Sequence, residues 1–188
     1  MSGPKEDYGP RGDASRHLPL AALEAAVRAL PPGPKDAGRL RLIIRRHADG
    51  SREMLASAIL TPQEGVPGDR WGRRPAPNPR TQLAVMRFDI AEVIANGQPL
   101  TLFGDNLFVD LDLTAAGLPP GARLKVGQAV LEVSPEPHNG CLKFKGRFGA
   151  DALRFVQAEP TRELNLRGVY WTVVEAGQVY AGAPIERL

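Results

Sequence analysis

Glycine and proline interrupt this chain at short intervals, and that spacing limits its fold more than any other feature. The sequence contains 20 glycines and 18 prolines in 188 residues. Many of them separate short apolar runs, such as residues 107–113 and 129–133. Short runs bounded by turn residues are typical of strands in compact antiparallel folds rather than of βαβ units. The sequence therefore predicts a mainly β protein with inserted short helices, folded as a barrel or a sandwich. An α+β fold with an open mixed sheet is the alternative.

The clearest strand pattern begins at Arg39, where leucine or isoleucine at positions 40, 42 and 44 alternates with other side chains. This period of two indicates a half-exposed strand. Residues 47–52 contain an Asp-Gly turn, so residues 53–60 are expected to return alongside as a second strand. Further strands are predicted over residues 82–88, 107–113, 123–126, 129–133, 169–175 and 178–181.

Three segments have helical spacing instead. Apolar side chains recur every three or four residues from Leu18 to Leu30, and a proline-rich stretch directly afterwards ends this helix. A second helix is expected from Asp89, which has capping-box spacing with Glu92, to about Asn96. A third helix is expected over residues 148–158.

Length and composition indicate one folded domain with an N-terminal extension. Apolar residues make up 43% of the chain, which excludes wholesale disorder. Residues 1–17 are predicted to form a disordered tail, residues 18–38 an N-terminal helix with a proline-rich linker, and residues 39–188 the β domain. Residues 61–80 hold too many prolines and glycines for a regular element, so we expect a long surface loop there.

The composition also argues against several classes of protein. Cys141 is the single cysteine, so no internal disulfide is possible, and no apolar run is long enough to span a bilayer. The first residues contain no apolar stretch of the kind found in secretory signals, so we expect a soluble cytoplasmic protein with no membrane partner. Aromatic residues make up 6% of the chain, which argues against base stacking and hence against single-stranded nucleic acid as a partner.

The common catalytic and nucleotide-binding motifs are missing from the sequence. It contains no G-x-x-x-x-G-K-[ST] or G-x-G-x-x-G loop, no H-E-x-x-H, no pair of cysteines at zinc spacing and no G-x-S-x-G. Only 3 histidines are present, and His17 and His47 fall in the predicted tail and turn. A multi-histidine metal site is therefore not expected.

Residues 134–148 bring together the side chains with the most chemical potential. Cys141 follows His138 and an Asn-Gly pair, and the cations Lys143 and Arg147 come directly after it. A thiol flanked by cations favours the thiolate form, which binds soft metals and attacks electrophiles. The alternative is that Cys141 is a small buried apolar residue with no chemistry.

Two further turn segments carry polar side chains. Asp105 and Asn106 place a carboxylate and an amide at the entrance of a predicted strand. Arg70, within residues 67–72, offers a guanidinium that can hold a phosphate through two hydrogen bonds. Plain turns, in which the side chain bonds its own backbone, are the alternative for both segments.

Taken in order along the chain, six segments resemble the MOSC domain, the family of the C-terminal domain of molybdenum-cofactor sulfurase. They are GVPGDRWG (65–72), TQLAVM (81–86), GDNLFVDLDL (104–113), LPPGARLKVGQAVLEV (118–133), PHNGCLKFKGRFGADALRFV (137–156) and LRGVYWTVVEAGQVYAGAPI (166–185). The resemblance covers residues 39–188, and it is to the stand-alone bacterial members of the family.

The resemblance implies a MOSC-type β-barrel that binds molybdenum cofactor (molybdopterin). It implies that Cys141 is the metal ligand or carries transferable sulfur. His138 is the expected catalytic acid, because an unperturbed histidine titrates near neutral pH. The positions in the family's motifs that are expected to bind the cofactor are Arg70, Asp105, Asn106, Asn139, Lys143 and Arg147.

These implications leave more than one function open. The chain is expected to be a reductase of N-hydroxylated compounds or a carrier of cofactor or sulfur. It lacks an iron–sulfur cysteine set and the aminotransferase-like part of the sulfurase, so a separate electron-donor protein or sulfur donor is expected as a partner. The alternatives are a metal-free persulfide carrier, and a non-catalytic module that binds an anion or a protein through Arg70, Arg73, Arg74 and Arg80.

Overall fold

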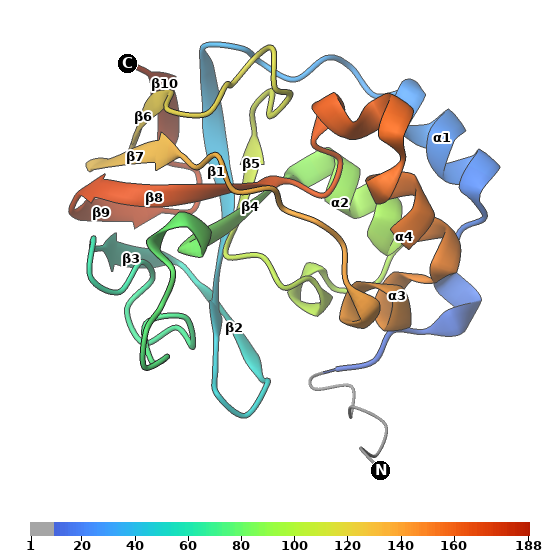
Figure 1. Ribbon diagram of the computed structural model, residues 1–188, viewed down its shortest axis with the longest axis horizontal. Coiled ribbons are helices and arrows are strands. Elements are labelled where there is room, and N and C mark those ends of the chain that lie inside the picture. The colour runs from blue at the N-terminus through green and yellow to red at the C-terminus, as the bar shows by residue number, and fades with distance from the viewer. Residues whose placement is uncertain (1–9) are drawn as a thin grey trace.

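The structure is a computed structural model that describes residues 10–188, and it contains a β-barrel with helices packed beside it (Figure 1). The strands are β1 Ala37–Arg46, β2 Arg52–Leu55, β3 Ser57–Leu60, β4 Leu83–Arg87, β5 Leu107–Asp110, β6 Arg123–Val126, β7 Ala129–Val133, β8 Val169–Glu175, β9 Gly177–Tyr180 and β10 Pro184–Arg187. The α-helices are α1 Leu20–Arg28, α2 Phe88–Ala95, α3 Leu142–Phe148 and α4 Ala150–Gln157. Short 3-10 helices lie at Ala14–Arg16, Pro79–Thr81, Leu100–Leu102 and Glu159–Leu164.

The barrel closes because its first strand pairs with its last. The order around the wall is β10-β6-β7-β8-β4-β5-β1, and residues 37–39 of β1 pair antiparallel with residues 184–186 of β10. β4 and β5 run parallel, whereas the other neighbours in the wall run antiparallel. The closed wall confirms the predicted mainly β barrel with short helices. The open mixed sheet, our alternative, is not what residues 10–188 form.

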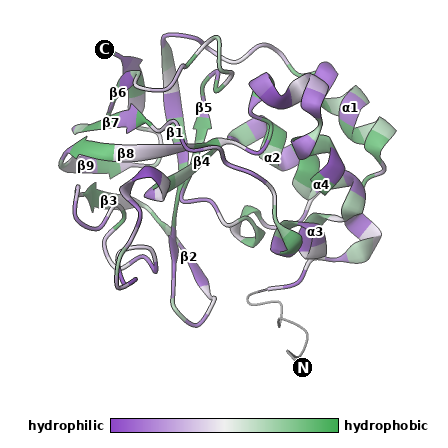
Figure 2. Ribbon diagram, in the orientation of Figure 1, coloured by the Kyte–Doolittle hydropathy of each residue, from purple (hydrophilic) through white to green (hydrophobic). Residues whose placement is uncertain are grey.

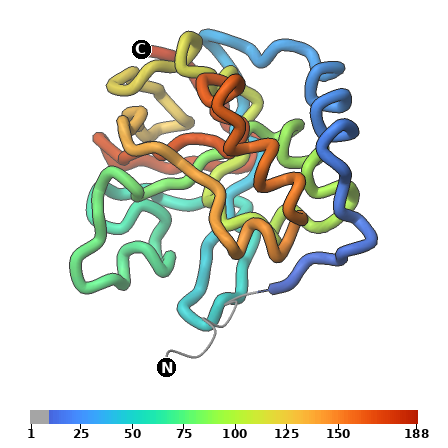
Figure 3. The backbone as a smooth tube through the Cα atoms, turned by 45° about the vertical axis from the view of Figure 1, so that its right-hand side comes forward, coloured from blue at the N-terminus to red at the C-terminus, as the bar shows by residue number. Residues whose placement is uncertain are grey.

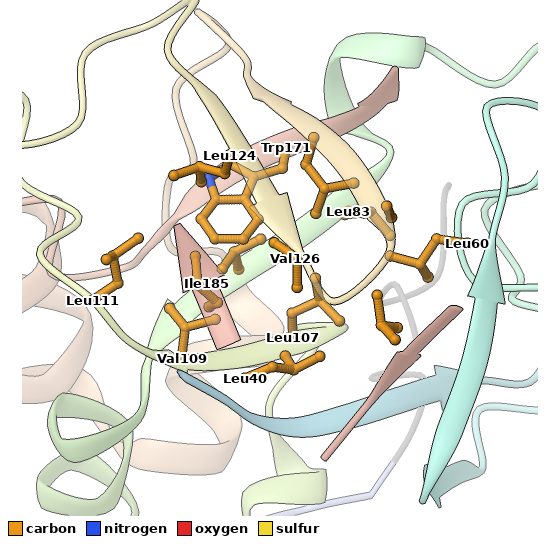
Figure 4. Packing of buried hydrophobic residues seen from close by; sticks show 14 of the residues in the cluster. Leu40, Leu60, Leu83, Leu107, Val109, Leu111, Leu124, Val126, Trp171 and Ile185 are labelled. Carbon is orange, nitrogen blue, oxygen red and sulfur yellow. The ribbon is translucent and has the colours of Figure 1, made fainter. Parts of the chain in front are cut away.

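The barrel interior is filled by the inward-facing half of each strand. In β6, for example, Leu124 and Val126 are buried while Arg123 and Lys125 face outward. Trp171 of β8 is fully buried among leucine, isoleucine and valine side chains from the other strands (Figure 4). Removal of this apolar surface from water is the main force that holds the wall closed.

A second apolar core lies between the outside of the barrel and the helices. Figure 2 shows hydrophobic residues, in green, on the helices that contribute to it. α1 and α4 lie side by side in this layer (Figure 3). The Phe103 ring stacks on Phe148 at 4.2 Å and meets Phe108 of β5 edge-on at 5.7 Å. Phe144 of α3 joins the same cluster, 5.0 Å from Phe148. These contacts fix α3, and Cys141 at its start, against the barrel.

Most predicted strands and helices form. The differences arise where pairing with residues distant in the sequence determines where an element begins and ends. Residues 53–60 do not form one strand, because a bend at Ala56 divides them between two strands. β2 pairs with β1, whereas β3 pairs with β9. α2 begins before Asp89, so the predicted capping box with Glu92 does not form. The Asp89 Oδ1 atom instead accepts the N–H of Ile90 at 2.8 Å.

One strand and one α-helix lie outside the predictions altogether. β10 contributes one fully buried side chain, Ile185, and nevertheless closes the barrel. α3 precedes the predicted third helix, and Gly149, at φ 95°, separates it from α4. Among residues 10–188, no helix combines the length and the apolar character needed to cross a bilayer.

Residues 10–17 are predicted to belong to a disordered tail, yet in the structure they are ordered against the helices. The N–H of Asp13 donates to Gln98 Oε1 at 2.7 Å. The Nε of Arg147, in α3, donates to the carbonyl oxygen of Pro10 at 3.3 Å. The difference arises because these long-range hydrogen bonds compensate the entropy lost by ordering the segment. The rest of the predicted tail lies outside the described residues.

Candidate functional site

Charged and polar side chains converge where the barrel meets α3. They come from the end of β1, the start of β2 and three connections, at residues 67–71, 104–106 and 134–141. The last of these connections is the chain that descends from β7 to α3 in Figure 1. Loops carried by a closed barrel can hold side chains in fixed positions, which suits a binding site.

Cys141 is exposed and forms the N-cap residue of α3, with extended backbone angles of φ −131° and ψ 175°. The loop that leads to it is tethered at both ends. The N–H of Ser134 donates to the carbonyl oxygen of Tyr170 at 2.8 Å, and Gln157 Nε2 donates to the carbonyl oxygen of Gly140 at 2.9 Å. The alternative interpretation of Cys141 as a buried apolar residue is therefore wrong.

Asp69 and Arg46 form a buried ion pair that ties the long loop to the end of β1. Asp69 accepts from Arg46 Nη2 at 2.7 Å and Nε at 3.0 Å, and also from its backbone N–H at 2.7 Å. Burial alone raises the pKa of the Asp69 carboxyl. The hydrogen bonds and charge of Arg46, with the backbone N–H of Trp71, outweigh burial, so the pKa lies below its ordinary value. The pair thus stays ionised and fixed at neutral pH.

Asn106 lies fully buried directly behind this ion pair. Its Nδ2 donates to Asp69 Oδ1 at 3.1 Å and to the carbonyl oxygen of Ile44 at 3.2 Å, and its Oδ1 accepts the N–H of Ala84 at 3.2 Å. The amide therefore joins β1, β4 and the long loop. This arrangement holds Asp69 in place.

Asp105 is also fully buried, and its carboxylate is paired with Arg167, which precedes β8. Arg167 Nη1 lies 2.9 Å from both Asp105 oxygens, and the guanidinium carbon sits 5.0 Å from the Phe144 ring centre. The pair therefore links the barrel to α3. On its other side, Asp105 Oδ1 is 3.7 Å from His138 Nδ1.

His138 is held in a buried slot between Asp105 and Tyr170. Its side chain is 6% exposed, and its ring centre lies 4.3 Å from that of Tyr170. Burial, followed by the positive charges of Arg167 and Arg46, lowers the pKa of His138 well below 6.5. The ring is therefore neutral at physiological pH. Among the described residues, its Nδ1 has no hydrogen-bond partner.

Positive charge accumulates around Arg52 at the start of β2. Its Nε donates to the carbonyl oxygen of Phe103 at 3.0 Å, which directs the guanidinium toward the site. Burial and, after it, the neighbouring charges of Arg147, Arg70 and Arg46 together lower the pKa of Arg52 to about 10. Arginine keeps its proton at neutral pH even so, which means that several cations crowd one another here.

Lys143 and Arg147 extend this crowding to Cys141. Partial burial lowers the pKa of Lys143, with Arg70 and Arg147 acting in the same direction, while Cys141 opposes the shift. Burial likewise lowers the pKa of Arg147, and Cys141 again opposes. We call Arg52, Arg70, Lys143 and Arg147 the basic cluster. Cations held this close attract an anion, because bound negative charge relieves their mutual repulsion.

A cavity of about 420 Å³ opens on the other side of His138. The exposed residue Asn139 contributes to its wall. Its lining residues are Pro137, His138, Asn139, Val156, Gln157, Arg162, Asn165, Leu166 and Arg167. Within residues 10–188, no group of three or more histidine, cysteine, aspartate or glutamate side chains is arranged to hold a metal ion.

The predicted site residues thus fall into three places. Arg70, Lys143 and Arg147 come together in the basic cluster near Cys141. Asp105 and Asn106 are fully buried and hydrogen-bond to protein groups. Asp105 therefore acts on the site by positioning Arg167, and Asn106 by positioning Asp69. His138 and Asn139 line the separate cavity. Whether each of these side chains contacts a cofactor stays a prediction.

Five residues that build the site were not predicted from the sequence: Arg46, Arg52, Asp69, Arg167 and Tyr170. One pattern could have identified Arg46. Two adjacent arginines end β1, and neighbouring strand residues point to opposite faces, so one of the two faces the barrel end. Arg70 was predicted as a site residue, and its neighbour Asp69 was not. It is nevertheless Asp69 that forms the buried ion pair with Arg46.

A family model described as the MOSC domain matches residues 78–186. The chain belongs to the MOSC domain family. Among solved structures, the YuaD protein from Bacillus subtilis superposes with a TM-score of 0.61 at 18% identity, over 80% of this chain and 95% of that chain. YiiM from Escherichia coli gives 0.53 at 23% identity, over 80% of this chain and 69% of that chain. At these identities the neighbours support the MOSC fold alone, and no curated protein matches the sequence.

Proposed function

We propose that this MOSC protein binds molybdenum cofactor at Cys141 and reduces N-hydroxylated compounds with electrons from a separate donor protein. The observation that carries the proposal is an exposed thiol beside the basic cluster. Thiolate sulfur is a soft ligand suited to a metal such as molybdenum, and guanidinium and ammonium groups bind phosphate. The two kinds of donor match the two ends of a metal-bearing pterin phosphate.

The residues present fit such a cofactor in charge and in donor type. The pKa of Arg52 is lowered to about 10 by burial and by the cations near it, and a bound anion would offset the repulsion among these cations. Cys141 would supply a single protein sulfur, so the remaining ligands of the metal would come with the cofactor. When bound, the cofactor supplies two-electron oxidation–reduction chemistry.

The surrounding residues have distinct tasks under this proposal. The basic cluster binds the phosphate, and the Asp69–Arg46 pair fixes the loop that carries Arg70. The Asp105–Arg167 pair holds the wall behind His138. These pairs act by keeping the binding groups in position before the ligand arrives.

The role of His138 as catalytic acid stays a prediction, but the structure changes the pKa on which that prediction is based. The prediction assumes an ordinary pKa, whereas burial lowers the pKa of His138 well below 6.5. A proton on Nδ1 would face Asp105, 3.7 Å away, and would leave Nε2 as an acceptor. His138 would then take up a proton at Nε2 before it delivers one.

A second candidate is a carrier of cofactor or of persulfide sulfur, and the exposure of Cys141 favours it. A thiol at the surface is open to a macromolecular partner, whereas catalysis on a small molecule benefits from exclusion of water. The chemistry also differs. A persulfide on Cys141 would add the mass of one sulfur atom to that peptide in the absence of molybdenum.

The test is the molybdenum and pterin content of the wild type and Cys141→Ala, purified anaerobically from a host that makes the cofactor. We expect near-stoichiometric metal in the wild type and its loss in the variant. Arg123→Gln is the matched control, because Arg123 is exposed on β6 and pairs with Glu132, away from the site. Equal metal in wild type and Cys141→Ala would refute Cys141 as the ligand. Sulfur-loaded, metal-free protein would support the carrier instead.

A further inference from the structure

The outward face of α3 begins directly beside Cys141 and differs from the inward face. Leu142, Lys145 and Gly146 are exposed, whereas Phe144 and Phe148 are buried in the helical core. Positions 142, 145 and 146 share one helical face, because positions 145 and 146 follow position 142 by three and four residues. This face therefore forms a continuous strip that runs away from the thiol.

The strip lines a shallow groove of about 460 Å³. Leu142, at its Cys141 end, is 74% exposed, the largest exposed fraction among the large apolar side chains of the described residues. Its apolar surface would gain free energy if a partner at the groove covered it. The groove is lined by His17, Leu142, Lys145, Gly146, Gly149 and Ala150.

The floor of the groove consists of residues with small or absent side chains. Gly146 lies in the interior of α3 and is exposed, a position where glycine costs about 1 kcal/mol relative to alanine. The absence of a side chain at the exposed residue Gly146 leaves room for a polypeptide backbone to approach. The 7 residues of α3 rise about 10 Å, which an extended segment of about three residues spans.

The charge of this region is one-sided. Residues 141–150 contain Lys143, Lys145 and Arg147 and no acidic residue. The next residue, Asp151, accepts the N–H of Leu20 at 3.1 Å. Arg52 and Arg70 of the basic cluster add further positive charge near this segment. An acidic segment is therefore the complementary occupant.

We propose that this groove docks an extended, acidic segment of a second protein and delivers it to Cys141. The occupant places an apolar side chain on Leu142 and a carboxylate near Lys145, with its backbone over Gly146. The identity of what is exchanged rests on the proposed function, since the partner would be the electron or sulfur donor. The groove itself is independent of that chemistry.

The test uses the full-length protein and two synthetic peptides, each with one cysteine activated as a mixed disulfide with thionitrobenzoate. One peptide carries leucine and glutamates beside its cysteine, and the other carries leucine and lysines. Cys141 attacks the peptide sulfur, a new S–S bond forms, and thionitrobenzoate leaves with the electron pair. Cys141 is the sole cysteine of the chain, so the coloured product reports on this thiol alone. Iodoacetamide, which is small and neutral, reports its intrinsic reactivity.

We expect the acidic peptide to react about tenfold faster than the basic one at low ionic strength, and Lys145→Glu to reduce that preference. Gly146→Leu fills the groove and is expected to slow the acidic peptide about fivefold without slowing iodoacetamide. Gly146→Ala is the matched control, because it removes glycine yet leaves the groove nearly open. A melting curve for each variant verifies folding.

Two results would overturn the docking groove. One is equal rates for the two peptides. The other is an acidic preference that Gly146→Leu leaves intact, which would mean that the basic cluster attracts the peptide without the groove. Absence of molybdenum from the wild type would count against the proposed function and would leave this kinetic comparison unaffected.

Discussion

Arg167 Nη1 lies 2.9 Å from each carboxylate oxygen of Asp105, and both side chains are almost completely buried. Removal of Arg167 alone would leave a buried, uncompensated carboxylate. We therefore expect Arg167→Met to lower the free energy of unfolding by about 3–5 kcal/mol. Urea denaturation of wild type and variant measures this difference.

Arg123→Gln provides the comparison for that measurement. Arg123 also pairs with a carboxylate, that of Glu132, but these side chains are 53% and 39% exposed. Solvent screens such a pair, so its loss is expected to cost about 0–1 kcal/mol. A similar cost for the two variants would show that the Asp105–Arg167 pair does not brace the barrel against α3.

The buried state of His138 predicts a pH-dependent stability. Its pKa lies well below 6.5 in the folded protein because of burial and the charges of Arg167 and Arg46. The unfolded chain therefore binds a proton more readily than the folded chain. The stabilising contribution is fully present above about pH 6.5 and is lost as the pH falls below it, by at most about 1.4 kcal/mol per pH unit.

His138→Gln isolates this contribution from the other two histidines. We expect the free-energy difference between wild type and variant to shrink as the pH falls from about 7 to 5. Urea denaturation across that range measures it, and the ring signals of His138 in an NMR titration give the protonation state directly. A ring that titrates near pH 6.5 in the folded protein would contradict the neutral, buried state.

The basic cluster predicts stabilisation by a simple divalent anion. Sulfate should raise the melting temperature of the wild type above its value in chloride of matched ionic strength, because it binds the folded state alone. Arg52→Gln removes one of the crowded cations and should weaken sulfate binding by about 1.5–3 kcal/mol. Equal stabilisation of wild type, Arg52→Gln and the distant variant Arg123→Gln would mean that sulfate acts non-specifically.

The fold could be predicted as far as local patterns determine it. Alternation marks β1 and β6, and helical spacing marks α1. β10 was not predicted, because it begins with Pro184, ends with two charged residues and has Ile185 as its one buried side chain. What makes this segment a strand is its pairing with β1 and β6, far away in the sequence. The break at Ala56 has the same origin, since β3 pairs with β9.

The site residues likewise divide into those that local sequence could group and those that it could not. Cys141, Lys143 and Arg147 could be grouped from sequence because they lie within one short segment. Arg52 and Arg167 stand alone among residues that give no sign of a site, and only the closed barrel brings them near that segment. An arginine side chain is normally solvated, so the burial of these two became evident only in the structure. The MOSC resemblance identified the region but did not supply these residues.

The ordered N-terminal segment predicts a link between residues 10–17 and the basic cluster. A Cβ atom at Gly12 would lie 1.8 Å from the carbonyl oxygen of Arg147, a backbone atom, so Gly12→Ala must displace the segment or α3. The hydrogen bond from Arg147 Nε to Pro10 would then be lost, and the guanidinium would be less well positioned for an anion. We expect sulfate affinity to fall about threefold, as measured by the sulfate-dependent melting temperature. Ser15→Ala, an exposed change in the same segment, should leave the affinity unchanged. If Gly12→Ala alters the melting temperature equally in sulfate and in chloride, the segment stabilises the fold but does not orient Arg147.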